Sequence, residues 1–219
     1  HTHSGGDYPK MFQNLFEQAG IKAKIKVYDV SSAQLPGPGS CDGFLITGSR
    51  AGSTDGDLWI TLLKVFIQDC YEQHTKVIGV CFGHQIIADA LGGKVERSHK
   101  GWGIGMHQVH IGTQRPWMQP FQDNLSLVFS HRDQVTALPP GAELIAQSEH
   151  CAIQMYHIED RIFGVQGHPE MRKTHSAALI ERYQHLFKDG TALAGRESLD
   201  ALANDGHIVA QWMVHLLTQ

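Results

Sequence analysis

The sequence has few cysteines, and they form no recognisable pattern. Cys41, Cys70, Cys81 and Cys151 are scattered over the 219 residues, and no two of them stand at C-x-x-C spacing. Zinc ribbons and the disulfide frameworks of small secreted domains depend on such regular spacing. We therefore predict neither kind of scaffold, and we expect the protein in the reducing cytoplasm.

Long apolar runs, basic charge and internal repeats are lacking as well. No apolar run is long enough to cross a bilayer, and no secretory signal is visible. The formal net charge of −4 gives no basic footprint for nucleic acid. We therefore expect no membrane or nucleic-acid partner, no bound metal and no cofactor.

The first half of the sequence alternates helices with short buried strands. Segments 42–47 and 77–80 are apolar and predict buried strands, and Asp57 stands where a helix between them would begin. Such an alternation indicates an α/β fold with a parallel sheet covered on both faces. The helix after Asp57 carries a wide apolar stripe made of Leu58, Trp59, Leu62, Leu63, Phe66, Ile67 and Tyr71.

Shorter strands follow, and they predict an antiparallel or mixed extension of the sheet. His107 and His110 lie on one of them, where the alternation of a strand places them on opposite faces, so we expect no metal site there. Another half-exposed strand is predicted near the start, over 21–27, and two helices near the end, over 177–187 and 198–217. Gly206 would allow a break in the second of these helices. The middle strands are predicted over 94–97, 104–111, 125–129, 142–147, 152–155 and 161–165.

Cys81 lies on a sharp turn between the strand 77–80 and a helix that Gly92 ends. Gly79 stands two positions before it and Gly83 two positions after it. This is the pattern of a nucleophile elbow, G-x-S-x-G, with cysteine in place of serine. The glycines are needed because a Cβ would collide with the neighbouring backbone, and the helix N-terminus favours a thiolate. The pattern favours a nucleophile over a buried structural cysteine.

A cysteine nucleophile needs a base, and the base needs an orienting group. His168-Pro169-Glu170 supplies both, directly after the apolar strand 161–165. Residues two apart in extended backbone point the same way, and Pro169 favours that backbone at His168. The rival base is His84, but on the elbow helix its side chain would point away from the elbow tip. We therefore prefer His168, with Glu170 as its partner.

Residues 48–53 form a glycine-rich loop after the strand 42–47. No Gly-Lys-Ser/Thr follows, which argues against a phosphate-binding loop. Two interpretations stay open: backbone N–H groups that face an oxyanion, and an ordinary tight turn.

Taken together, these motifs resemble the triad-type (class I) glutamine amidotransferases. The resemblance extends from Gly6-Asp7-Tyr8-Pro9 to the last helix and includes the spacing between the motifs. It implies a three-layer flavodoxin-like sandwich with a mostly parallel central sheet, an antiparallel extension and C-terminal helices. The matching segments are Gly79-Val80-Cys81-Phe82-Gly83-His84-Gln85, His168-Pro169-Glu170, Thr47-Gly48-Ser49 and Ser130-His131-Arg132-Asp133-Gln134-Val135.

The resemblance implies a role for each matching residue. Cys81 would attack the side-chain amide of glutamine, His168 would move the protons, and Glu170 would hold the imidazole. Backbone N–H groups of Gly48 and Phe82 would form the oxyanion hole. The residues that would seat the substrate are Gln85, Ser130, His131 and Asp133.

The resemblance also implies a domain organisation. We expect an amidotransferase domain over 1–190 and a helical extension over 191–219, packed on the same domain. The family has a further inner strand before the loop that corresponds to residues 1–3. No ATP-pyrophosphatase signature follows His168, so the chain resembles the free-standing members named after the glutaminase part of GMP synthetase.

The leading prediction is a glutaminase that releases ammonia to an unidentified acceptor or synthetase partner. Two alternatives stay open. The related gamma-glutamyl peptidases share the Cys-Phe-Gly-His-Gln elbow, and a catalytically silent regulatory subunit could keep the same fold.

Overall fold

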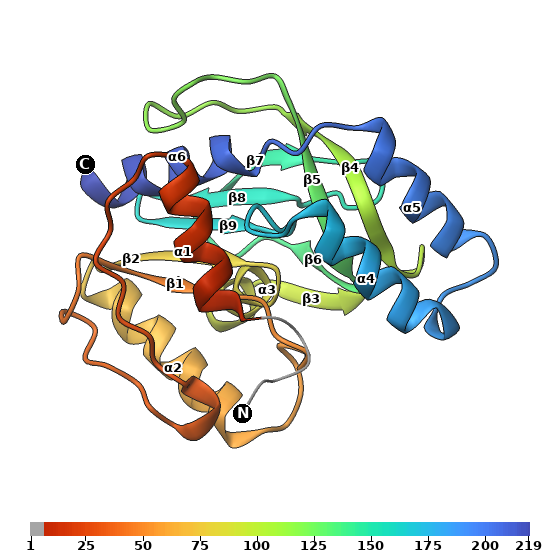
Figure 1. Ribbon diagram of the computed structural model, residues 1–219. Coiled ribbons are helices and arrows are strands. Elements are labelled where there is room, and N and C mark those ends of the chain that lie inside the picture. The colour runs from red at the N-terminus through yellow and green to blue at the C-terminus, as the bar shows by residue number, and fades with distance from the viewer. Residues whose placement is uncertain (1–6) are drawn as a thin grey trace.

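The computed structural model describes residues 7–219 and contains a seven-stranded sheet with helices on both faces (Figure 1). The strand order is β1-β2-β9-β8-β7-β4-β5, and β3 and β6 form a small separate sheet. The strands are β1 (Gly43–Ile46), β2 (Lys76–Val80), β3 (Lys94–Arg97), β4 (Gly103–Ile111), β5 (Asn124–His131), β6 (Asp133–Ala137), β7 (Ala142–Gln147), β8 (Met155–Ile158) and β9 (Ile162–Val165).

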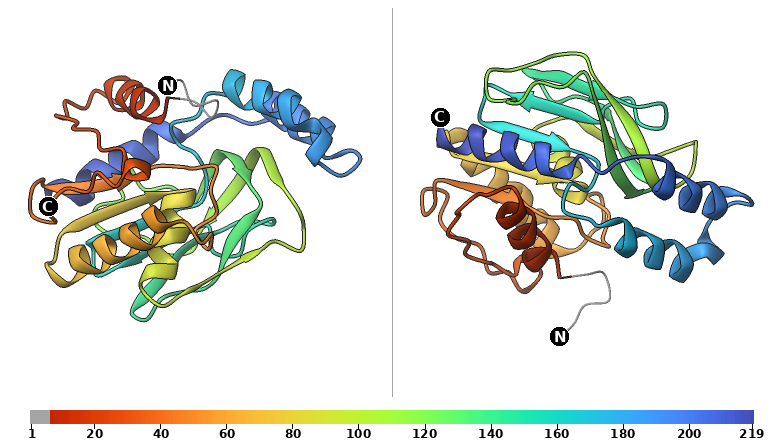
Figure 2. Two further views of the ribbon diagram at one scale, coloured as in Figure 1. Left: turned by 90° about the horizontal axis from the view of Figure 1, so that it is seen from below. Right: turned by 45° about the horizontal axis from the view of Figure 1, so that its top comes forward.

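The helices form two outer layers. Apolar residues of α1 and α6 pack with Ile78 and Val80 on one face, and those of α2 and α3 pack with Val77 on the other. Helices α4 and α5 cover β4 and β5 (Figure 2). The helices are α1 (Tyr8–Gln18), α2 (Leu58–Glu72), α3 (Phe82–Ala90), α4 (Lys173–Tyr183), α5 (Thr191–Ala201) and α6 (Gly206–Thr218), with 3-10 turns η1 (Val30–Ser32) and η2 (Gln184–Leu186).

The sheet is parallel at one side and antiparallel at the other. β1, β2 and β9 run parallel, and β8, β7, β4 and β5 extend the sheet by antiparallel pairing. The last four residues of β2 and all of β9 are buried, as expected of strands covered on both faces. The predicted α/β fold with an antiparallel extension is therefore confirmed.

The strand predicted over 21–27 is wrong. That segment forms no strand, and Ile25 and Val27 are 43% and 59% exposed. Alternating apolar residues indicate a half-exposed surface, but a strand also needs a hydrogen-bonding neighbour. Within residues 7–219, β1 is the edge of the sheet and 21–27 has no strand beside it. The loop expected at residues 1–3 lies outside the described residues.

Other boundaries differ from the sequence predictions for identifiable reasons. The strand predicted over 152–155 is β8, which begins only at Met155, and β6 was missed because it pairs with β3 outside the main sheet. Asp57 is the N-cap of α2, but its side chain caps no backbone N–H. Leu58, counted in the apolar stripe, is 72% exposed.

The segment predicted as helical over 198–217 forms the end of α5 and nearly all of α6, and the break between them, residues 202–205, lies next to Gly206, where the sequence allows one. The segment between the two helices is hydrogen-bonded to β5. The Asp205 N–H donates to the Ser126 carbonyl, and the Ser126 N–H donates to the Asp205 carboxylate. α6 belongs to the core: Trp212, Met213 and Leu216 are fully buried. A division of the chain at residue 190 remains a prediction.

None of the helices between residues 7 and 219 is both long and apolar enough to cross a membrane.

Two glycines let α3 pack tightly against the sheet. A Cβ on Gly83 would lie 2.1 Å from the Ile46 carbonyl oxygen of β1. A Cβ on Gly79 would lie 2.4 Å from the backbone of Gly83. Real Cβ atoms do not approach backbone so closely, so α3 would have to move away from β1 and β2. The glycines of the elbow are therefore required by packing.

We expect Gly83→Ala to lower the free energy of unfolding by about 2 kcal/mol or more, because backbone on both sides of the new methyl group would have to shift. Urea denaturation measures this. The matched control is Gly37→Ala, since a Cβ at Gly37 meets nothing within 4 Å. Wild-type stability in the Gly83 variant would contradict the packing argument.

Candidate active site

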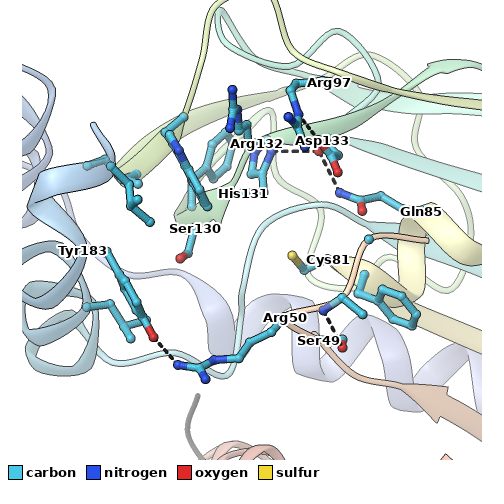
Figure 3. Close-up of a pocket in the computed structure, with 18 of the residues that line it drawn as sticks. Ser49, Arg50, Cys81, Gln85, Arg97, Ser130, His131, Arg132, Asp133 and Tyr183 are labelled. Atoms are coloured by element: carbon cyan, nitrogen blue, oxygen red, sulfur yellow. Dashed lines mark hydrogen bonds and ion pairs between the residues drawn. The ribbon is translucent and has the colours of Figure 1, made fainter. Parts of the chain in front are cut away.

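Cys81 sits in a strained backbone conformation between β2 and α3. Its φ and ψ are 54° and −102°, in a region that a residue with a side chain rarely adopts. The neighbours fix this conformation: the Cys81 N–H donates to the Val165 carbonyl at 2.9 Å, and the Cys81 carbonyl accepts from the Gln85 N–H at 3.1 Å. The strain holds the sulfur at the wall of a cavity (Figure 3).

The N-terminus of α3 begins directly behind that sulfur. Phe82 and Gly83 occupy the first turn, where backbone N–H groups have no carbonyl of their own helix to bind. Such donors favour negative charge near them. Phe82 lines the cavity, and its ring packs against Trp59 with 5.6 Å between ring centroids. An anion formed at Cys81 would therefore lie next to unpaired donors.

His168 and Glu170 form a buried pair in the segment that follows β9. The His168 Nδ1–H donates to the Glu170 Oε1 at 2.7 Å, and the two side chains are 1% and 0% exposed. The His168 N–H donates to the Val128 carbonyl at 2.8 Å, which anchors the segment to β5. The carboxylate therefore sets the tautomer and orientation of the imidazole.

Two opposing effects act on the pKa of His168. Burial lowers the pKa, but the negative charges of Cys81 and Glu170, and hydrogen bonds to both, raise it more. The net result is a pKa well above the ordinary value. The site therefore stabilises a protonated His168, the form that arises when this residue takes a proton from a nucleophile.

Tyr8 covers the other side of the imidazole. Its ring stacks on His168 with 6.2 Å between centroids and 12° between planes. Burial raises the pKa of Tyr8, and the charges of Cys81 and Glu170 raise it further, so the phenol stays protonated. At Gly48, a Cβ would lie 2.9 Å from the Tyr8 oxygen and 3.1 Å from His168 Cε1. Only glycine fits without displacing these rings.

The cavity beside Cys81 has a volume of about 540 Å³. Gly48 itself is buried behind the wall, and the next residues of its loop, Ser49 and Arg50, line the cavity. The predicted residues Phe82, Gln85, Ser130, His131 and Asp133 also line it. The structure thus brings the predicted substrate-seating residues to the same cavity as Cys81, while His168 and Glu170 lie buried behind it.

Gln85 holds the polar end of the cavity together. Its side-chain N–H groups donate to the Asp133 carbonyl at 2.7 Å and to the Gln166 Oε1 at 3.0 Å. His131 donates from Nδ1 to the same carbonyl at 3.3 Å, and the Asp133 carboxylate lies 3.5 Å from Arg97 Nε. The amide nitrogen of Gln85 is therefore committed to the protein, and Gln85 fixes the backbone at Asp133.

His84, the rival base, points away from the cavity. It is fully buried, and its ring packs against Tyr156 with 4.9 Å between centroids. Burial lowers the pKa of His84 from 6.5 to about 3. An imidazole with so low a pKa is a weak base, and its place behind α3 keeps it away from the cavity that Cys81 lines, so the geometry favours His168.

The other cysteines differ from Cys81 in environment. Burial is the main cause that raises the pKa of Cys70 and Cys151 to about 12, so both thiols stay protonated. Cys41 is exposed and lies outside the cavity. Among residues 7–219, no group of three or more His, Cys, Asp or Glu side chains is placed to hold a metal ion.

Several cavity residues were not predicted as site residues from the sequence, among them Tyr8, Arg50, Arg97 and Tyr183. Tyr8 falls in a segment that carried the family resemblance, which was the one available signal. Arg97 stands opposite Asp133 in the β3–β6 pair, a register that is visible only once β6 is known. Arg50 belongs to the glycine-rich loop 48–53 and Tyr183 to the helix predicted over 177–187, but the two meet only in the folded chain.

The comparisons with known proteins agree with this fold. The family model for glutamine amidotransferase class-I matches residues 4–184. The crystal structure of a glutamine amidotransferase from Methylobacillus flagellatus superposes with a TM-score of 0.75 at 27% identity, covering 94% of this chain and 86% of that one. The fold thus defines an α/β protein of amidotransferase type. The chain belongs to the class I glutamine amidotransferase family.

Two curated relatives differ in activity. Gamma-glutamyl peptidase 3 from Arabidopsis thaliana is 32% identical over 83% of this chain and 76% of its own length. The glutamine-hydrolysing GMP synthase from Pectobacterium carotovorum is 30% identical over 82% of this chain but only 35% of its own length.

The buried His84 should make stability depend on pH. Its pKa is 6.5 in an unfolded chain and about 3 in the fold. Between these values the unfolded chain binds the extra proton, so the free energy of unfolding falls as the pH falls. We expect wild type to lose about 1.4 kcal/mol per pH unit more than His84→Leu below about pH 6.

Urea denaturation at a series of pH values gives both slopes. His110→Gln is the control, since this histidine is exposed on β4 and should keep the wild-type slope. Identical slopes for wild type and the His84 variant would show that His84 is not held neutral by the fold.

Proposed function

We propose that the protein is a cysteine hydrolase of γ-glutamyl amides, with Cys81 as nucleophile, His168 as general base and acid, and Glu170 as orienting residue. The observation that carries the proposal is the Cys81 sulfur on a strained elbow, beside an imidazole that a buried carboxylate holds at 2.7 Å. A nucleophile, its base and the orienter of that base are the three parts that such catalysis needs.

The proposed reaction has two steps. Cys81 Sγ bonds to the γ-carbonyl carbon, His168 takes the thiol proton and gives it to the departing nitrogen, and the C–N bond breaks. Water then attacks the thioester with His168 as base, and the C–S bond breaks as the proton returns to sulfur. The products are glutamate and an amine. The Glu170 carboxylate, 2.7 Å from His168 Nδ1, stabilises the protonated imidazole that forms between these events.

The negative oxygen formed in each step would be held by backbone donors. We assign this role to the N–H of Phe82 in the first turn of α3 and to the N–H of Gly48. Phe82 lines the cavity and Gly48 lies against His168. Each such donor typically contributes about 3 kcal/mol to the transition state.

The glutamyl end would bind at the polar end of the cavity. The Asp133 carboxylate would hold the α-ammonium group, and Arg97 beside it would hold the α-carboxylate. Ser130 and His131 would contribute mainly through the backbone that Gln85 fixes. This assignment places the γ-carbonyl toward Cys81.

Among γ-glutamyl amides, we propose γ-glutamyl peptides as the preferred substrates. A cavity of about 540 Å³ falls in the range of pockets that accept ligands larger than one amino acid. The similarity to gamma-glutamyl peptidase 3 over most of both chains supports the same choice.

The second candidate is a glutaminase that passes ammonia to a synthetase. The similarity to the glutamine-hydrolysing GMP synthase favours it. This chain matches only about a third of that enzyme, so a synthetase part would have to be supplied by a partner. Kinetics on glutamine and on a γ-glutamyl dipeptide, with and without a candidate synthetase, separate the two. A partner that raises the turnover of glutamine above that of the dipeptide would favour the glutaminase.

We expect Cys81→Ala to reduce hydrolysis of every γ-glutamyl substrate at least about 10³-fold, because no thioester can form.

Glu170→Gln should lower kcat about 10²- to 10⁴-fold with a small change in KM, because an amide can hold the wrong tautomer of His168. Release of glutamate measures both.

Cys41→Ala is the matched control, since it removes an exposed thiol outside the cavity. Wild-type rates in Cys81→Ala would overturn the assigned nucleophile. A wild-type protein that hydrolyses no γ-glutamyl amide would favour a regulatory subunit.

A further inference from the structure

The Tyr8 hydroxyl lies beside Gly48, one of the two residues whose N–H we assign to the negative oxygen. A Cβ on Gly48 would lie 2.9 Å from the Tyr8 oxygen and 3.1 Å from His168 Cε1, so both groups border the space that the absent side chain leaves. Tyr8 also lines the cavity that Cys81 lines. The hydroxyl is therefore close to the base and to a proposed oxyanion donor at the same time.

Tyr8 is held in place by the helix that it begins. It is the first residue of α1, and the Asp7 side chain caps this helix by accepting from the Lys10 N–H at 3.1 Å. Phe12, one turn further along, is 3% exposed and belongs to the core cluster that includes Cys81. A donor that is fixed in advance needs no reorganisation when charge develops beside it.

The hydroxyl can donate a hydrogen bond but does not release its proton. Within residues 7–219, no protein group forms a hydrogen bond with it. Burial raises the pKa of Tyr8, and the negative charges of Cys81 and Glu170 raise it further, so the phenol stays neutral. A neutral phenol with so high a pKa is a donor to an anion, and it is too weak an acid to protonate a leaving group.

The proton relay between Cys81 and His168 does not need this hydroxyl. The imidazole edge that borders the space at Gly48 is Cε1, a carbon between the two ring nitrogens. Nδ1 donates to Glu170 at 2.7 Å, and the ring is also hydrogen-bonded to Cys81. A hydroxyl beside the reacting pair but outside the relay has the oxygen of the attacked carbonyl as its natural acceptor.

We propose that the Tyr8 hydroxyl is a third donor to the negative oxygen that forms at the attacked carbonyl, beside the N–H groups of Phe82 and Gly48. Tyr8 is then a catalytic residue that keeps its proton in both steps. The inference rests on the proposed function and adds a side-chain donor to two backbone donors.

Two reagents distinguish an oxyanion donor from a general effect on the thiol. p-Nitrophenyl acetate acylates Cys81 Sγ: the C–S bond forms through a tetrahedral carbon with a negative oxygen, and p-nitrophenolate leaves. Iodoacetamide alkylates the same sulfur by displacing iodide from a methylene carbon, so no oxyanion forms. Every variant carries Cys41→Ala, because the exposed thiol of Cys41 would otherwise react as well.

We expect Tyr8→Phe to lower the acylation rate with p-nitrophenyl acetate, and kcat for γ-glutamyl amides, at least about tenfold, as for the loss of other oxyanion donors. Alkylation by iodoacetamide should stay within about twofold of the parent rate from pH 5 to pH 9, because the ring and the Cys81–His168 pair are retained. KM should change little, since the carbonyl oxygen carries no full charge in the bound substrate.

Tyr28→Phe is the matched control, because it removes the same hydroxyl from a tyrosine that does not line the cavity. It should keep all three rates. Unchanged acylation and kcat in Tyr8→Phe would overturn the proposal. Alkylation that slows in the same proportion as acylation would also overturn it, since the hydroxyl would then act on the thiol or its base.

The acylation assay separates this inference from the proposed function, because p-nitrophenyl acetate has no γ-glutamyl group. If wild type hydrolyses no γ-glutamyl amide but Tyr8→Phe slows acylation alone, the proposed function is wrong and the donor stands. If wild type hydrolyses γ-glutamyl amides and Tyr8→Phe changes neither acylation nor kcat, the function stands and the donor is wrong.

Discussion

The close approach of α3 to the parallel strands is the constraint on which the site depends. Gly79 and Gly83 remove the two Cβ atoms that would keep the helix away from β1 and β2. The chain must then turn within one residue, and Cys81 takes the positive φ that this turn requires. The same turn places the first N–H groups of α3 behind the sulfur. The strain at Cys81, its place at the cavity wall and the nearby helix N-terminus therefore share one packing cause.

A second constraint comes from the far end of the chain. α6 begins against the segment that carries His168 and Glu170: a Cβ on Gly206 would lie 2.0 Å from the Pro169 carbonyl oxygen. Asn204 donates to the Met171 carbonyl at 2.9 Å and so holds the other side of that segment. The 2.7 Å contact between His168 and Glu170 is therefore supported by residues outside the span that the family model matches.

Features formed by residues close together in the sequence could be predicted from it, because those neighbouring residues alone determine them. The elbow has its glycines, its strand and its helix within one short stretch, and His168 and Glu170 are two residues apart. Features that need a distant partner could not be read. Segment 21–27 alternates like a strand but has no neighbouring strand within residues 7–219, and Arg50 meets Tyr183 only because α4 folds over the cavity. The roles assigned to the site residues remain predictions.

The two ends of the cavity are built from different parts of the fold. The end that we assign to the glutamyl group is lined by residues of α3, β3 and β6, and Gln85 and His131 both donate to the Asp133 carbonyl of β6. The opposite end is built from a loop and from α4 and η2, which are held mainly by side-chain contacts such as that of Arg50 with Tyr183. Changes at α4 can therefore alter the lining of this end of the cavity while Cys81, His168 and Glu170, which come from other parts of the fold, keep their geometry. Within one fold, the same reacting groups could thus serve ammonia release or peptide hydrolysis.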